Sequence, residues 1–133
     1  MSVRYASVYA EALTAATPIG AAARHALKVS QRWHAPAILP AEVLSALRGM
    51  VLGGHLAAHR ANRARERLGQ SRIRLHSFAP HAERVWELRE NLTVYDAWYV
   101  AVAEALGATL LTTDGRLAGA SGIRCDVRHV TGQ

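Results

Sequence analysis

The stretch NLTVYDAWYVAVAEALGATLLTTDGRL, residues 91–117, decides the fold because it holds a complete helix and the strand that follows it. Thr93 is a typical helix N-cap, and Asp96 stands three residues later in the first helical turn. The apolar helical pattern ends at Gly107, a residue type that is common just past a helix C-terminus. The short apolar run Thr109 to Leu111 then predicts a buried parallel strand. The stretch therefore predicts one helix-then-strand unit of an α/β sheet.

The remaining chain alternates predicted helices with short predicted strands. Strands are expected at residues 3–6, 34–38, 72–78 and 123–130, and helices at residues 7–13, 18–29, 41–52, 55–68 and 80–88, the second of them capped by Thr17. This alternation predicts a central, mainly parallel sheet covered by helices, which is a three-layer α/β/α domain. A chain of 133 residues with 50% hydrophobic residues suits a single domain over residues 1–133.

Charge and cysteine content narrow the choice of partner and compartment. The net charge of +6 favours an anionic partner such as nucleic acid or an acidic protein. Fifteen of the sixteen basic residues are arginine, and GC-rich coding also produces such an excess without selection for binding. The sole cysteine, Cys125, excludes an internal disulfide and a cysteine-rich zinc site. The sequence shows neither a signal-peptide pattern nor an apolar run long enough for a bilayer, so we expect a cytoplasmic protein without a membrane partner.

Three acids are predicted to lie at the same edge of the sheet. Glu42 and Asp96 fall in the first turns of their helices, and Asp114 follows a strand directly. Any one of them alone is more typical of a helix-dipole contact, worth about 0.3–1 kcal/mol. Gathered at the carboxyl ends of parallel strands, carboxylates roughly 5 Å apart would repel by roughly 3 kcal/mol a pair at an effective dielectric near 20. A divalent cation relieves that repulsion, and an all-oxygen set suits Mg²⁺ or Mn²⁺.

Three segments resemble the later motifs of PIN-domain toxins of the VapC type: AEVLSALR at residues 41–48, YDAWYVA at residues 95–101 and LTTDGRL at residues 111–117. The resemblance covers nearly the whole chain. It implies a divalent-metal-dependent endoribonuclease, the toxin of a type II toxin–antitoxin pair, which hydrolyses RNA with a metal-activated water. It also implies a VapB-type antitoxin partner and a homodimer. The implied catalytic and metal-binding acids are Glu42, Asp96 and Asp114, with Ser7 and Thr112 as supporting hydroxyls.

The chain departs from this family at its first motif. The family has Asp-x-Ser or Asp-x-Thr at the end of the first strand, whereas this chain reads Tyr5-Ala6-Ser7. A phenol with an ordinary pKa near 10 stays protonated at neutral pH and is a poor ligand for a hard cation. Two hypotheses therefore stay open: an active ribonuclease toxin, or a catalytically impaired PIN domain that binds RNA or the antitoxin. In a third, Tyr5 was introduced into a native enzyme and silences this copy.

Arginines supply the candidate contacts to RNA. Arg60, Arg63 and Arg67 share one face of the predicted helix 55–68, which is typical of a phosphate-tracking stripe. The same pattern also fits a solvated face with Glu66 as its counter-charge. Arg48 and Arg116 are further candidates, either for steadying a phosphate or as structural arginines.

Aromatic residues cluster on either side of Asp96. Trp86, Tyr95, Trp98 and Tyr99 are expected to pack in the core or on a dimer face, not to stack on bases. We therefore assign no aromatic RNA platform from the sequence.

Overall fold

The computed structural model describes residues 2–14, 18–29 and 33–131, and the predicted cap Thr17 lies outside this range. Its centre is a five-stranded sheet in the order β3-β2-β1-β4-β5, and every neighbouring pair is parallel. The strands are β1 (Ser2–Arg4), β2 (Trp33–Pro36), β3 (Ile73–His76), β4 (Thr109–Thr112) and β5 (Val127–His129). The predicted mainly parallel sheet is therefore confirmed.

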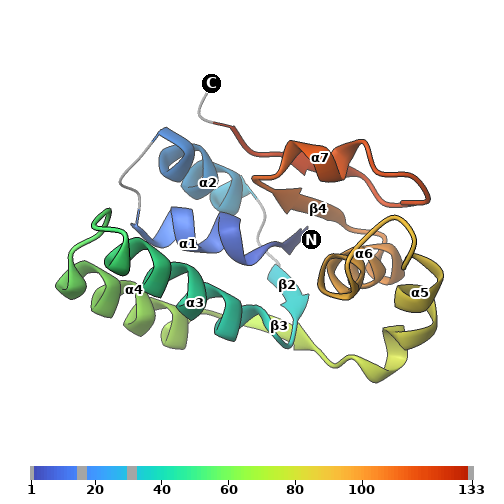
Figure 1. The fold of residues 1–133 in the computed structure, drawn as a ribbon, viewed down its shortest axis with the longest axis horizontal. Coiled ribbons are helices and arrows are strands. Elements are labelled where there is room, and N and C mark those ends of the chain that lie inside the picture. The colour runs from blue at the N-terminus through green and yellow to red at the C-terminus, as the bar shows by residue number, and fades with distance from the viewer. Residues whose placement is uncertain (1, 15–17, 30–32, 132–133) are drawn as a thin grey trace.

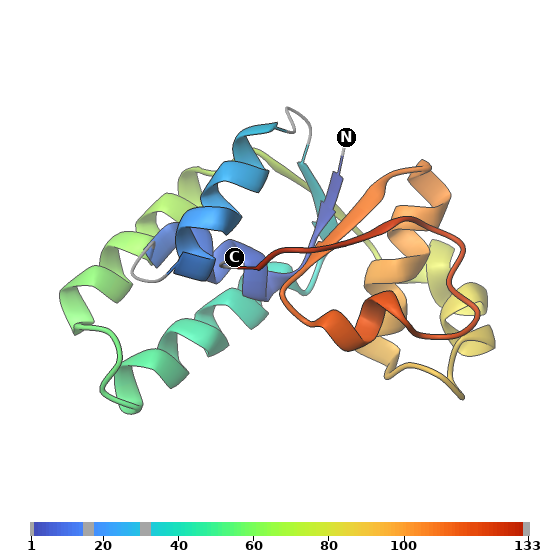
Figure 2. The ribbon, with the colours of Figure 1, turned by 90° about the horizontal axis from the view of Figure 1, so that it is seen from above.

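Helices cover both faces of this sheet. They are α1 (Ala6–Thr14), α2 (Pro18–Val29), α3 (Leu39–Leu52), α4 (Ala58–Gln70), the 3-10 turn η1 (Ala79–His81), α5 (Ala82–Glu87), α6 (Val94–Leu106) and α7 (Gly115–Ala118). Figures 1 and 2 show α1 to α4 on one side of the sheet and α5 and α6 on the other. Helix α6 contacts β1, β2 and β4, and α1 contacts α2, α3 and α4. The predicted three-layer α/β/α fold is confirmed.

Helix α6 begins and ends as its sequence predicts. The Thr93 side chain accepts a hydrogen bond from the backbone N–H of Asp96 at 3.1 Å. Gly107 follows the last turn with φ +61°, a left-handed conformation that an L side chain rarely adopts. The turns between these caps are buried from Ala97 to Ala103, so α6 is the central helix of its layer. It therefore holds Asp96 firmly at the carboxyl edge of the sheet.

Several predicted boundaries differ from the structure by a few residues, and three of these differences matter most here. Helix α4 starts at Ala58 and not at residue 55, because Gly54 at φ +76° forms a turn after α3 and Ala57 is extended. The predicted strand at residues 123–130 pairs only over Val127–His129, opposite the short strand β4. The polar turn after β4 continues into α7, because Asp114 caps that helix.

The aromatic residues divide between the interior and the surface. Trp98 and Tyr99 are buried, whereas Trp86 is 62% exposed and Tyr95 is 56% exposed. The guanidinium of Arg89 lies over the exposed Trp86 ring at 4.6 Å from its centroid. Core packing is therefore confirmed for Trp98 and Tyr99, whereas packing on a dimer face stays a prediction for Trp86 and Tyr95. None of the helices that the structure describes is long and apolar enough to cross a membrane.

Candidate functional site

Tyr5 stands at the carboxyl edge of the sheet, between the end of β1 and the start of α1. Its backbone N–H donates to the carbonyl of Leu111 at 3.0 Å, which continues the β1–β4 ladder by one residue and fixes the position of the side chain. The Tyr5 ring stacks on the ring of Tyr99 from α6, with centroids 4.1 Å apart and an interplanar angle of 12°. Two aromatic rings therefore occupy the centre of the edge where the sequence predicts clustered acids.

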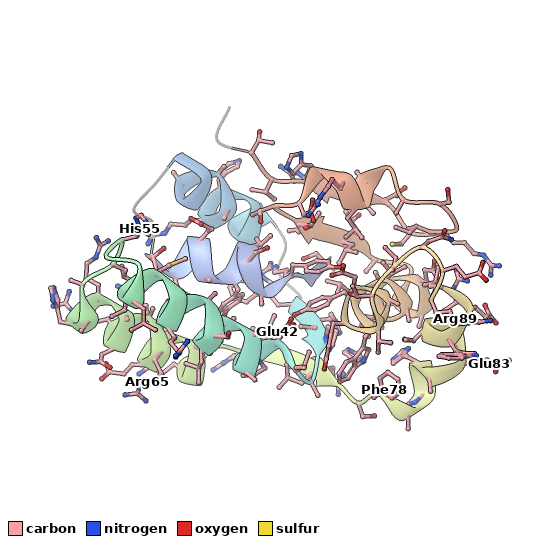
Figure 3. All side chains as sticks on the ribbon, viewed as in Figure 1. Glu42, His55, Arg65, Phe78, Glu83 and Arg89 are labelled. Carbon is pink, nitrogen blue, oxygen red and sulfur yellow. The ribbon has the colours of Figure 1, made fainter. Side chains whose placement is uncertain are left out.

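Each of these phenols donates a hydrogen bond to one predicted acid. The Tyr5 hydroxyl lies 3.1 Å from Asp96 Oδ1 and 3.3 Å from the Asp96 carbonyl oxygen. The Tyr99 hydroxyl lies 2.8 Å from Glu42 Oε1. Figure 3 shows Glu42 at the start of α3, where that helix approaches β2. We call these four residues the tyrosine–acid cluster.

Both phenols stay protonated in this setting. Burial raises the pKa of Tyr5 above its ordinary value, and the Asp96 carboxylate and its hydrogen bond raise it further. Burial also raises the pKa of Tyr99, with the Glu42 carboxylate as the next cause. At neutral pH the cluster therefore holds two neutral donors, each of which serves one carboxylate.

Asp114 has its own partners at the end of β4. Its backbone N–H donates to Thr112 Oγ1 at 3.0 Å, and its Oδ1 accepts from the backbone N–H of Arg116 at 3.0 Å. The Arg116 guanidinium donates to both carboxylate oxygens at 3.2 Å. These hydrogen bonds hold the pKa of Asp114 below its ordinary value. Asp114 therefore holds the Arg116 guanidinium in place.

Further polar contacts support the loop that carries Asp114. Thr113 Oγ1 donates to Ser7 Oγ at 2.9 Å, which ties the loop to α1. The His129 ring lies 3.1 Å from the Thr113 carbonyl through Nε2. A Cβ on Gly115 would stand 2.9 Å from His129 Cε1, so a larger residue there would require the exposed His129 ring to shift. Ser7 was predicted, whereas Thr113 and His129 were missed because their contacts join segments far apart in the chain.

Tyr99 is the other residue that sequence reasoning missed. The sequence offered one signal, because Asp96 and Tyr99 are three residues apart and so share a face of α6.

The arginines predicted to contact RNA lie away from the tyrosine–acid cluster, apart from Arg116. Arg48 lines a groove between α3 and α4, while Arg60, Arg63 and Arg67 line a pocket beside α1.

The residues present at this edge do not fit Mg²⁺ or Mn²⁺ as they stand. Within residues 2–14, 18–29 and 33–131, no three His, Cys, Asp or Glu side chains gather closely enough to hold a metal ion. Asp96 and Glu42 each accept from a phenol, and both oxygens of Asp114 face Arg116. A hard cation needs oxygen acceptors, and the neutral Tyr5 hydroxyl at the centre is directed at Asp96 as a donor.

Comparison with known proteins gives the family. The sequence model of the PIN domain matches residues 6–122. Ribonuclease VapC1 of Mycobacterium tuberculosis (strain ATCC 25618 / H37Rv) is 42% identical over 101 residues, which are 73% of this chain and 74% of that protein. VapC ribonuclease Mb0985 of Mycobacterium bovis is 35% identical over 104 residues, 78% of this chain and 82% of its own.

A solved structure agrees on the fold. The crystal structure of Mycobacterium tuberculosis VapC20, described as a Sarcin-Ricin loop cleaving toxin, superposes with a TM-score of 0.69 at 18% identity. The match covers 93% of this chain and 97% of that one. With the sequence matches, it shows that this chain belongs to the PIN-domain family and is a relative of its VapC ribonuclease toxins.

Proposed function

We propose that this chain is a VapC-type PIN domain that binds RNA and a VapB-type antitoxin, and that it does not cleave RNA while Tyr5 stands in its first motif. The observation that supports this proposal is the hydrogen bond from the Tyr5 hydroxyl to Asp96 at 3.1 Å. In the resemblance to the family, Tyr5 takes the place of an aspartate, and Asp96 is one of the acids that bind metal. The neutral Tyr5 hydroxyl therefore donates to Asp96 from the position where the family has an aspartate.

The electrostatics of the tyrosine–acid cluster support the same conclusion. Replacement of an aspartate by Tyr5 removes one negative charge, and the two neutral phenols stabilise the carboxylates of Asp96 and Glu42 through hydrogen bonds. A hydrogen bond to a charged group contributes about 1.5–3 kcal/mol. A cation that bound Asp96 and Glu42 through these oxygens would have to replace both hydrogen bonds. Its attraction to the remaining acids is offset by that loss.

A second candidate is the metal-dependent endoribonuclease, silenced in this chain by Tyr5. Two contacts favour this candidate. The Tyr5 hydroxyl donates to Asp96, and the Tyr5 ring stacks on Tyr99, which donates to Glu42. An aspartate at position 5 would therefore add a carboxylate beside acids that the fold already gathers. In this hypothesis the Tyr5→Asp revertant cleaves RNA, and its cleavage requires Mg²⁺ or Mn²⁺.

One assay tests both candidates, which both predict that this chain does not cleave RNA; cleavage by Tyr5→Asp would support the second. This chain, Asp96→Asn, Tyr5→Asp, and Tyr5→Asp combined with Asp96→Asn are incubated with a mixed RNA pool and Mg²⁺ or Mn²⁺, and RNA binding is measured in parallel. We expect this chain to bind RNA without cleaving it, the revertant to cleave, and the double variant to lose cleavage. Cleavage by this chain that disappears in Asp96→Asn would contradict our proposal and establish an active enzyme. If neither this chain nor Tyr5→Asp cleaves RNA but both still bind it, RNA binding would be the sole function of the two.

Two further expectations concern the oligomeric state and the cellular compartment. The homodimer follows from the resemblance to the family, and the cytoplasmic location follows from the single Cys125. Sedimentation of the purified chain, alone and with its antitoxin, would test the first of these.

A further inference from the structure

Four arginines surround a pocket beside the far end of α1. The pocket has a volume of about 210 Å³ and is lined by Leu13, Thr14, Arg24, Arg60, Arg63 and Arg67. These residues come from α1, α2 and α4, which Figures 1 and 2 show on the same side of the sheet. We call this hollow the arginine pocket.

The fold holds these arginines in place through α4 and α1. Arg60, Arg63 and Arg67 recur at helical spacing, and Ala64, which is 1% exposed, anchors their face of α4. The Arg60 Nη2 donates to the Thr14 carbonyl at 2.8 Å, at the C-terminal end of α1. This contact fixes one guanidinium before any ligand arrives. Arg24 reaches the same pocket from α2, which the spacing along α4 could not predict.

The charge of the arginine pocket has no counterpart among the residues that the structure describes. No Asp or Glu is among its described lining residues, and none of its four guanidinium groups forms an ion pair with a described carboxylate. Elsewhere the chain does pair its arginines: Arg84 contacts Glu104 at 2.6 Å, and Arg116 contacts Asp114 at 3.2 Å. Like charges that share a pocket repel, and a bound anion relieves that repulsion. Guanidinium groups bind phosphate through paired N–H donors.

A second hollow adjoins the first and has an aromatic wall. Its volume is about 430 Å³, and it shares Leu13, Arg24 and Arg67 with the arginine pocket. Its other lining residues are Tyr9, Ala12, Trp33 and Ser71. Tyr9 is only 2% exposed, and its ring meets the partly buried Trp33 ring edge to face at 6.1 Å, while the Arg4 guanidinium lies over Trp33 at 3.9 Å from the ring centroid. The accessible aromatic surface is therefore that of Trp33. Aromatic surface beside guanidinium groups suits a nucleotide, which carries a flat base next to a phosphate. An acidic peptide would satisfy the charges but makes no specific use of the aromatic wall.

We propose that the two hollows together bind one nucleotide of a single-stranded RNA, with its phosphate among the arginines and its base against the accessible surface of Trp33. This inference rests on the proposed RNA binding and adds a site for it. The site is separate from the tyrosine–acid cluster, because neither hollow is lined by Glu42, Asp96 or Asp114. The arginine pocket lies at the C-terminal end of α1, whereas Tyr5 precedes the N-terminal end of that helix.

The test measures RNA affinity by fluorescence anisotropy across a salt series, for this chain and the variants Arg24→Gln, Arg63→Gln and Arg65→Gln. Arg24 and Arg63 line the arginine pocket, whereas Arg65, labelled in Figure 3, lies in the same helix α4 but lines the groove towards α3. All three are exposed, so each variant should fold. We expect Arg24→Gln and Arg63→Gln each to weaken RNA binding about tenfold and to lower the salt slope by about one, and Arg65→Gln to change it less than about twofold.

Two competitors test the chemistry of the ligand. A single-stranded RNA should compete better than inorganic polyphosphate of matched charge, because only RNA offers a base, and equal competition would overturn the nucleotide assignment. Poly-glutamate should compete weakly. If Arg24→Gln and Arg63→Gln impair poly-glutamate binding but not RNA binding, the pocket serves an acidic protein and our inference is wrong.

The variants also separate this inference from the proposed function. RNA binding by this chain that is no more sensitive to Arg24→Gln and Arg63→Gln than to Arg65→Gln would overturn the pocket alone. Absence of RNA binding by the unaltered chain would overturn the RNA part of the proposed function together with the pocket.

Discussion

The tyrosine–acid cluster and the arginine pocket both gather groups of like charge, but they differ in how the protein treats that charge. In the cluster, Asp96 accepts a hydrogen bond from the partly buried Tyr5 and Glu42 accepts one from the buried Tyr99. In the pocket, Arg24, Arg63 and Arg67 have no carboxylate partner among the described residues. A ligand that binds the carboxylates must replace hydrogen bonds to neutral donors, whereas a ligand that binds these arginines breaks no ion pair with a described residue. The comparison predicts that ligands bind at the pocket and that the cluster stays closed.

The largest expected effect comes from opening the cluster. In Tyr5→Asp, a third carboxylate replaces the donor to Asp96. At roughly 5 Å and an effective dielectric near 20, one added carboxylate attracts a divalent cation by roughly 7 kcal/mol, and even after desolvation removes half of this gain, roughly 3 kcal/mol is left, about a hundredfold in affinity. We therefore expect Tyr5→Asp to bind Mn²⁺ about a hundredfold more tightly than the unaltered chain, as measured by isothermal titration calorimetry.

Tyr5→Phe is the matched control for this change, because it removes the hydroxyl without adding charge. It should not gain Mn²⁺ affinity. Tight Mn²⁺ binding by the unaltered chain would show that its remaining acids suffice, and the contrast between cluster and pocket would fail.

The second effect comes from closing the pocket. Arg67→Glu places a carboxylate four residues after Arg63 on α4, where side chains one turn apart meet. The pocket then has an internal partner for its charge, as the cluster has. We expect RNA affinity to fall about thirtyfold, because two units of charge change at one phosphate site. Thermal stability should not rise, because the pair contributes about 0.2–0.5 kcal/mol whereas an acid in place of the basic residue in the last turn of α4 opposes the helix dipole by about 0.3–1 kcal/mol. A variant that binds RNA as the unaltered chain does would show that the unmatched charge of the pocket has no ligand of this kind.

The third effect tests whether the phenols stabilise the cluster. Tyr99→Phe removes the 2.8 Å hydrogen bond to Glu42 and leaves a half-buried carboxylate without that donor. Loss of a hydrogen bond to a charged group costs about 1.5–3 kcal/mol, which urea unfolding can measure. Tyr95→Phe is the matched control, because Tyr95 lies in the same helix and is 56% exposed. Equal stability of the two variants would mean that the Tyr99 hydrogen bond is not part of what holds the cluster together.

Features with a local cause could be predicted from the sequence. Thr93 and Gly107 limit α6 through contacts with their own neighbours, and their roles were read correctly. The arginine stripe on α4 follows from helical spacing alone. The start of α4 was placed too early because the turn at Gly54 depends on a backbone conformation that spacing does not reveal.

Contacts between distant segments were the part that sequence could not supply. Tyr99 and Glu42 are joined by a hydrogen bond between α6 and α3, and no pattern within either helix indicates the partner. Arg24 enters the arginine pocket only because α2 packs on α1. The substitution at Tyr5 was visible in the sequence, but its contact with Asp96 needed the fold. The acids could be chosen from the sequence, whereas the partners of each acid could not.

The smallest effect concerns a third group of residues, the histidines His76 and His81, whose pKa values the fold lowers. His34 Nδ1 lies 2.8 Å from His76 Nε2, and the His76 and His81 rings meet edge to face at 6.4 Å. Burial lowers the pKa of His76, with His81 and Arg74 as further causes, and burial lowers the pKa of His81. Histidine in the unfolded chain has a pKa of about 6.5, so below that pH the unfolded state binds more protons than the folded state.

Stability should therefore be complete above about pH 6.5 and should fall as the pH drops below that value through the lowered folded pKa of His76 and His81. Urea unfolding at a series of pH values measures this loss. His81→Gln should flatten the profile, whereas His59→Gln, at an exposed histidine of α4, should leave it unchanged. Equal profiles for the two variants would show that His81 is not one of the groups that stay neutral on folding. A flattened profile in His81→Gln alone would instead extend the comparison to a third way of treating charge. This fold keeps His76 and His81 neutral, stabilises the carboxylates of the tyrosine–acid cluster with hydrogen bonds from neutral phenols, and leaves the arginine pocket without a described carboxylate partner.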